Sequence, residues 1–137
     1  MNMVGAIFFM AVSQFMGSYM QTTQSFQHER PVFLREYANK MYTVFPYYAA
    51  KVLADIPTFI IVPFIYTVLT YYTIGFTISS ELFFGFFLTI VLDTIAAVSL
   101  GYLISSAFSN EGTALTIAPI IVMPLMLVGG FFSNTET

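Results

Sequence analysis

Apolar residues along this chain gather into four long runs that short polar segments separate. The runs cover roughly residues 3–20, 45–74, 82–108 and 113–132. Each is near or above the length of about 17–25 residues that a helix needs to cross the hydrocarbon core of a bilayer. The pattern therefore predicts an all-α membrane protein, a polytopic bundle of four transmembrane helices.

Polar and proline positions inside these runs modify the prediction. Ser13 and Gln14 interrupt the first run, which indicates that one face of its helix packs against protein or a cavity rather than lipid. Pro57 and Pro63 lie within the second run and are expected to kink it. Membrane helices tolerate such kinks where neighbouring groups satisfy the freed carbonyls.

The third run contains one carboxylate, Asp93, near its middle. A charged group at that depth is unfavourable, and it commonly marks a proton or polar-substrate site. The simpler reading, which we prefer, is a protonated or hydrogen-bonded Asp93 inside the bundle, with Thr89 one turn earlier as its partner. Both readings stay open on the sequence alone.

Between the first and second runs lies the one charge-dense segment, residues 27–40, with three of the four basic residues of the chain. Pro31 suits the first turn of a helix, and Glu36 and Lys40 form a favourable i,i+4 pair. We expect a short amphipathic helix over about residues 30–41 at the membrane surface, although a solvated loop helix fits the charges equally well. Just beyond it, Lys51 and Asp55 have the spacing of an interfacial ion pair.

Composition supports the membrane class and excludes most chemistry. The chain is 58% hydrophobic and only 8% charged, against about 25% charged residues in soluble domains. It has no cysteine and a single histidine, and no phosphate-binding loop or HExxH motif is present. We therefore expect no catalytic residue, no metal site and no cofactor on this chain, and no nucleic acid partner.

The positive-inside rule gives an orientation. All four Lys and Arg residues lie between the first and second runs, so that this connection is expected in the cytoplasm. The N-terminus would then lie outside, although no basic region precedes its apolar run as in a signal peptide. Because the chain also stops just after an apolar run, we expect it to be a piece of a longer gene product.

Several motifs, in order, resemble the transmembrane domain of the G subfamily of ABC transporters, and its White-like members most of all. The resemblance covers nearly the whole chain. The motifs are Glu29-Arg30-Pro31-x-Phe33-x-Arg35-Glu36, Lys51-x-x-x-Asp55-x-Pro57, Ser99-Leu100-Gly101 and Gly129-Gly130-Phe131-Phe132.

This resemblance implies that residues 1–137 are a single partial domain of the ABC-2 type, equivalent to helices 2–5 of a six-helix domain. In that family the charged segment is a coupling helix that docks on the nucleotide-binding domain, which binds ATP and magnesium and is not on this chain. Such half-transporters work as homodimers or heterodimers in the plasma membrane or an organelle membrane. The positions that match the coupling helix are Glu29, Arg30, Arg35, Glu36 and Tyr37.

The resemblance also implies where substrate binds. The second and fifth helices of the family line a cavity at the dimer axis, and an upper gate closes it at Phe131 and Phe132. The matching cavity positions are Phe8, Phe9, Ser13, Met16, Pro119, Val122, Met123 and Met126. Their apolar character implies a hydrophobic or amphipathic substrate of the lipid, sterol or pigment-precursor type. Thr43 replaces a basic residue of the family, and Asp93 replaces a small or apolar one.

The leading hypothesis is thus the membrane part of an ATP-driven exporter that works by alternating access. A proton-coupled carrier or channel that uses Asp93 is the alternative from another class. A non-transporting fragment is the third reading, because the chain lacks an ATPase domain.

Overall fold

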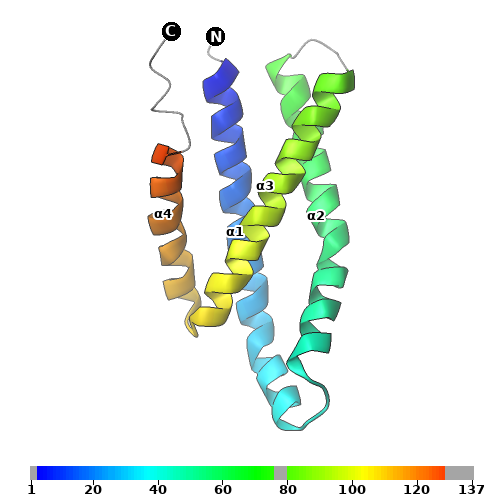
Figure 1. Cartoon of the computed structure of the whole chain (residues 1–137), viewed down its shortest axis with the longest axis vertical. Coiled ribbons are helices and arrows are strands. Elements are labelled where there is room, and N and C mark those ends of the chain that lie inside the picture. Colours follow the sequence, from blue (N-terminus) through cyan, green and yellow to red (C-terminus); the bar gives the residue numbers. More distant parts are fainter. Residues whose placement is uncertain (1–2, 76–79, 129–137) are drawn as a thin grey trace. The chain divides into compact units, whose positions relative to one another are not determined.

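A computed structural model of the chain describes residues 3–75 and 80–128, and within them it contains helices and no strands. The helices are α1 (Met3–Ala38), α2 (Val44–Ile74), α3 (Ser80–Ala107) and α4 (Glu111–Val128) (Figure 1). They divide between two compact units, and α1 and α3 each contribute to both. Unit 1 holds residues 1–27 and 97–137, and unit 2 holds residues 28–96.

Helix α1 is longer than the sequence pattern predicts. The expected first span at about 3–20 and the expected helix at about 30–41 are parts of one continuous helix of 36 residues. The polar stretch between them, residues 21–27, contains no glycine or proline that would end a helix. Pro31 consequently lies inside α1 rather than in a first turn, and it offers no N–H to the carbonyl of Gln27 one turn earlier.

A Schellman-type turn ends α1. The N–H of Lys40 donates to the carbonyl of Tyr37 over 3.0 Å, and that of Met41 donates to the carbonyl of Glu36 over 3.2 Å. Lys40 has a φ of 55°, the left-handed conformation that this motif places just after a helix end. The turn lets the chain reverse and begin α2 at Val44.

Unit 1 is built from the first part of α1, the last part of α3, and α4. Its core consists of Tyr19, Ala97, Ile104 and Ala114. The Tyr19 hydroxyl donates to the backbone carbonyl of Ala114 over 2.7 Å, so α1 is bonded to the start of α4. Where α1 crosses α3, a Cβ added to Gly101 would lie 3.2 Å from Cβ of Thr22, so a larger residue there would make a tight contact between the helices.

Unit 2 is built from the end of α1, α2, and the first part of α3. Aromatic side chains join α2 to α3: Phe64 packs edge-on against Phe87 with ring centroids 5.7 Å apart, and Tyr71 does so against Phe83 at 5.2 Å. Such T-shaped pairs stabilise a contact by about 0.5–1.5 kcal/mol more than the burial of their apolar area alone. They fix the contact between two helices whose other faces are largely exposed apolar surface.

By length and composition, α2 and α3 are the helices of the described residues that could cross a membrane. Their exposed surface is apolar, as at Leu69 (64% exposed) and Leu88 (62%), which suits contact with lipid. Spans in α1 and α4 remain predictions. Helix α1 contains several polar residues, and the fourth expected span runs to residue 132, outside the described residues.

Candidate functional site

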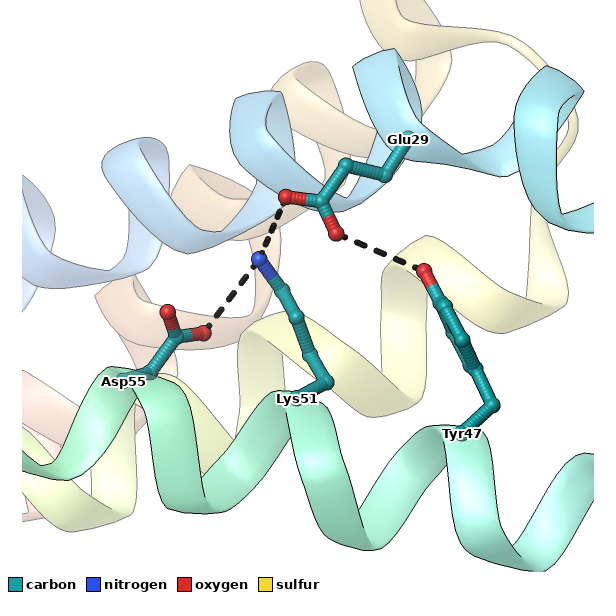
Figure 2. A network of polar contacts seen from close by, with 4 residues as sticks. All are labelled: Glu29, Tyr47, Lys51 and Asp55. Carbon is teal, nitrogen blue, oxygen red and sulfur yellow. Dashed lines mark hydrogen bonds and ion pairs between the residues drawn. The ribbon is translucent and has the colours of Figure 1, made fainter.

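Four polar side chains meet where the end of α1 lies against the start of α2 (Figure 2). Lys51 Nζ lies 2.7 Å from Glu29 Oε1 and 3.4 Å from Asp55 Oδ2. The Tyr47 hydroxyl donates to Glu29 Oε2 over 3.4 Å. We refer to Glu29, Tyr47, Lys51 and Asp55 as the charged cluster.

Helix geometry and a short turn assemble the charged cluster. Tyr47, Lys51 and Asp55 are spaced four residues apart and so share one face of α2. The turn of residues 39–43 folds this face back on α1, where Glu29 points toward it (Figure 2). The predicted spacing of Lys51 and Asp55 is thus realised as an ion pair, but the shorter contact of the lysine is with α1.

Lys51 is the least exposed of the three charged side chains in the cluster. Its side chain is 10% exposed, against 28% for Asp55 and 46% for Glu29. An ammonium group removed from water to this extent needs a charged partner, and here two carboxylates share it. The network ties α1 to α2 near the C-terminal end of α1.

An aromatic cluster lies beside the charged one. The ring of Phe33 packs against Tyr47, Tyr37 and Tyr42, with centroid distances of 4.3, 5.9 and 6.1 Å respectively. Tyr42 and Tyr47 stack in parallel at 5.9 Å. These contacts pack the rings of Phe33, Tyr37, Tyr42 and Tyr47 together, although most of the residues between 33 and 47 are exposed.

The Tyr42 hydroxyl donates a hydrogen bond to the carboxylate of Glu36. This bond, together with burial and the negative charge of Glu36, raises the pKa of Tyr42 from 10.0 to about 12. The carboxylate of Glu36 is thereby held against the turn, while Val32, Leu34 and Arg35 of the same segment are exposed.

That open surface combines apolar and basic groups. Val32, Leu34 and Tyr37 are 56%, 53% and 49% exposed, and Arg35 beside them is exposed as well. Arg30 is half-buried. Exposed apolar groups gathered on one segment are typical of a surface that contacts another protein or a membrane.

The residues expected to line a substrate cavity lie in unit 1. On α1, Phe9 is 73% exposed, Phe8 and Met16 are half-buried, and the Ser13 hydroxyl donates to the carbonyl of Phe9 over 2.8 Å. Phe9, Ser13 and Met16 lie at helical spacings of three to seven residues and share a face.

On α4, Met123 is 62% exposed and Pro119 half-buried, whereas Val122 is 6% exposed and packs inside the unit. Contact between α1 and α4 includes Tyr19 and Ala114, which share the core of the unit and a hydrogen bond. The side chain of Met126 and the expected gate at Phe131 and Phe132 lie outside the described part of the structure.

Asp93 lies in unit 2, half-buried on α3. Its expected partner Thr89 instead donates its hydroxyl to the carbonyl of Gly85 over 2.9 Å. Asp93 Oδ2 is buried and has no hydrogen-bond partner among the described residues. Tyr66 on α2 is close enough to Asp93 for the two side chains to interact electrostatically.

Some contributors to this site had no clear signal in the sequence. Tyr47 carries no motif, and only its four-residue spacing from Lys51 indicated a shared face. Gln27, which the sequence placed at the edge of the charged segment, is buried and bonded to α3. Among the described residues, no group of three or more His, Cys, Asp or Glu side chains could hold a metal ion.

Comparison with known proteins gives a consistent result over the whole chain. The family described as ABC-2 type transporter matches residues 1–137. Protein white of Ceratitis capitata is 36% identical over 135 residues, which are 98% of this chain and 20% of that protein. The ABC transporter ATP-binding protein/permease wht-1 of Caenorhabditis elegans is 38% identical over 104 residues, 76% of this chain and 16% of that protein.

A mammalian relative is more distant. The broad substrate specificity ATP-binding cassette transporter ABCG2 of Bos taurus is 27% identical over 137 residues, 99% of this chain and 21% of that protein. The chain thus spans about a fifth of the length of these relatives.

Proposed function

The chain belongs to the ABC-2 type transporter family, as an integral membrane domain related to White and other G-family members, and we propose that it couples ATP hydrolysis to export. The ATPase would be a separate domain, in the same gene product or supplied in trans, and it would bind the ATP and magnesium. Two half-transporters would form the working homodimer or heterodimer.

One observation carries this proposal: the charged end of α1 combines an open docking surface with a tight connection to α2. We define residues 28–38 as the coupling segment. Val32, Leu34 and Tyr37 supply exposed apolar surface on it, while Glu29 is bonded to Lys51 of α2. An ATPase domain that docks on the coupling segment could therefore move α1 and α2 together.

The mechanism would be alternating access. Closure of the two ATPase domains would push the coupling segment, and the displacement of α1 with α4 would open the cavity to the opposite side of the membrane. Exposed Phe9 and Met123 would face substrate or the second subunit. Because these positions are apolar, the substrate would be hydrophobic or amphipathic, of the lipid, sterol or pigment-precursor type.

Charge reversal in the coupling segment tests this function. In the full transporter in reconstituted vesicles, Glu36→Arg should lower the amount transported per ATP hydrolysed about tenfold, the size of a typical coupling free energy. Assembly should be unchanged. Glu81→Arg is the matched control, because Glu81 is an exposed acid in the first turn of α3 and lies outside the coupling segment.

Unchanged transport per ATP in Glu36→Arg would contradict the proposed coupling. Absence of any ATP-driven transport in the wild-type vesicles would favour a non-transporting fragment.

Asp93 is the observation that favours a second candidate function, a proton-coupled carrier or channel. Its buried Oδ2 has no partner in the described structure, so the carboxyl is available to bind and release a proton. On this alternative, transport would need a pH gradient and no ATP, and Asp93→Asn would abolish it. Transport driven by ATP and insensitive to Asp93→Asn would exclude it.

A further inference from the structure

The C-terminal end of α3 leaves backbone carbonyls that no residue of its own helix can satisfy. A helix ends with about four such groups, and those buried from water need donors from elsewhere. The N–H of Phe108 donates to the carbonyl of Ile104 over 3.1 Å. The next carbonyl, that of the fully buried Ser105, lies where α1 crosses α3.

Gln27 of α1 supplies the missing donors. Its Nε2 lies 2.9 Å from the carbonyl oxygen of Ser105 and 2.8 Å from that of Phe108, so both amide hydrogens are used. Gln27 is 9% exposed. The preceding residue of α1, Phe26, contacts Tyr102 of α3 edge-on with ring centroids 5.9 Å apart. The side chain thus caps α3 from another helix.

The residues that follow form a tight turn into α4. Only residues 108–110 separate α3 from α4. Asn110 caps α4, because its Oδ1 accepts from the N–H of Gly112 over 3.0 Å. One turn further, the carbonyl of Ala114 accepts from the Tyr19 hydroxyl of α1 over 2.7 Å. Helix α1 therefore holds this turn from both sides, at the end of α3 through Gln27 and at the start of α4 through Tyr19.

Gln27 also occupies a particular position along α1. Because Pro31 has no N–H, the backbone ladder of α1 lacks the bond to the Gln27 carbonyl. Glu29 of the charged cluster follows two residues later. The side chain of Gln27 thus anchors α1 to α3 one turn before Pro31 and two residues before the charged cluster.

We propose that Gln27 is a positioning residue, which together with Tyr19 makes the α3–α4 turn follow the displacements of α1. This inference rests on the proposed coupling function and adds to it the path by which α4 responds to the coupling segment. The two carbonyls that Gln27 binds lie at the negative end of the α3 dipole, so a donor is required there and an acceptor is excluded.

Three substitutions in the full transporter separate this role from simple packing. Gln27→Met keeps the length and removes both donors. Gln27→Glu places a carboxylate against two carbonyl oxygens. Gln27→Lys replaces the amide by a positively charged hydrogen-bond donor, and cationic side chains can donate to the last carbonyls of a helix. Gln24→Glu is the control, an exposed glutamine of α1 one turn earlier.

The readout is transport per ATP hydrolysed in vesicles, normalised to folded transporter. We expect Gln27→Glu to lower this ratio about tenfold, Gln27→Met to lower it less, and Gln27→Lys and Gln24→Glu to stay within about threefold of wild type. Thermal unfolding of each variant accompanies the assay, since a purely structural role would change the yield of folded protein and leave the ratio unchanged.

Two outcomes would overturn the proposal. A wild-type ratio in folded Gln27→Glu would show that the cap does not transmit motion, and a Gln27→Lys variant as uncoupled as Gln27→Glu would show that donor character is irrelevant. The proposed function fails separately: in that case wild-type vesicles show no ATP-driven transport, whereas failure of this inference alone leaves the wild type active and Glu36→Arg uncoupled.

Discussion

At the scale of single residues, Lys51 carries the greatest electrostatic constraint in the charged cluster. Its ammonium group is nearly buried and lies within 4 Å of carboxylates from two helices, Glu29 at 2.7 Å and Asp55 at 3.4 Å. Because Lys51 contacts two carboxylates, loss of either one leaves the other to pair with its charge. This arrangement keeps α1 attached to α2 even when one contact is stretched.

Redundancy of this kind predicts non-additive substitutions. Glu29→Gln and Asp55→Asn should each lower the free energy of unfolding by about 1 kcal/mol or less, since both carboxylates are partly exposed. The double variant removes both carboxylates that contact the nearly buried ammonium group of Lys51, so it should lose about 3 kcal/mol. Denaturant unfolding of the purified full transporter, arranged as a double-mutant cycle, measures the difference. Strictly additive losses would contradict the shared pairing.

The bond between Tyr42 and Glu36 predicts a pH effect. The pKa of Tyr42 is raised from 10.0 to about 12 in the folded protein, so the bond stabilises the fold below about pH 10. That stabilisation is lost as the pH rises through about 12. Glu36→Gln should shift the Tyr42 titration, followed by NMR of labelled tyrosine and assigned with Tyr42→Phe, back toward 10. A titration that does not move would show that Glu36 is not the cause.

At the scale of helices, the bounds of a helix could be predicted from the sequence where the local pattern of residues determines them. They could not be predicted where contacts with other helices determine them. The second apolar run predicted the bounds of α2 closely, although Pro57 and Pro63 lie inside it, because apolar residues dominate this long segment. The start of a helix at Pro31 was wrong: packing of Gln27 and Glu29 against other helices keeps α1 continuous through a residue that ordinarily begins or breaks one. No pattern on α1 alone could show that Gln27 caps α3.

Glycine positions give a prediction at this scale. A Cβ on Gly101 would lie 3.2 Å from Cβ of Thr22 and 3.4 Å from the backbone oxygen of Tyr19, which cannot move without displacing α1. Gly101→Ala should therefore lower the free energy of unfolding by about 1–3 kcal/mol. Gly85→Ala is the matched control on the same helix, with nothing within 4 Å.

Since alanine favours helix over glycine, the Gly85→Ala variant should gain about 0.5–1 kcal/mol. Thermal or denaturant unfolding of both variants checks the pair. Equal effects at the two positions would mean that α1 and α3 do not approach closely at Gly101.

At the scale of the whole molecule, membership of a membrane-transporter family gives a reason for the exposed apolar side chains. Some of them would contact lipid, and others would contact protein. Exposed leucines and phenylalanines cover α2 and α3, the two helices with the length and composition of membrane spans. Helix α1 carries an exposed Phe9 beside polar residues and is not apolar all round, which indicates a protein or substrate neighbour. The family of the chain could be predicted from its motifs, whereas the substrate could not, because apolar side chains select poorly among apolar ligands.

Cysteine cross-linking can test whether α1 or α3 forms the contact between two copies of the chain. The chain has no cysteine, so single cysteines can be introduced into it without competing thiols in this domain. If two copies meet along α1, Phe9→Cys in the full transporter should form a disulfide-linked dimer under mild oxidation, because disulfides need Cα atoms within about 7 Å. Leu88→Cys is the control: Leu88 is similarly exposed, at 62% against 73% for Phe9, but lies on the apolar helix α3. A linked dimer from Leu88→Cys and none from Phe9→Cys would show that the two copies meet along α3 and not along α1. The proposed cavity at Phe9 would then be contradicted as well.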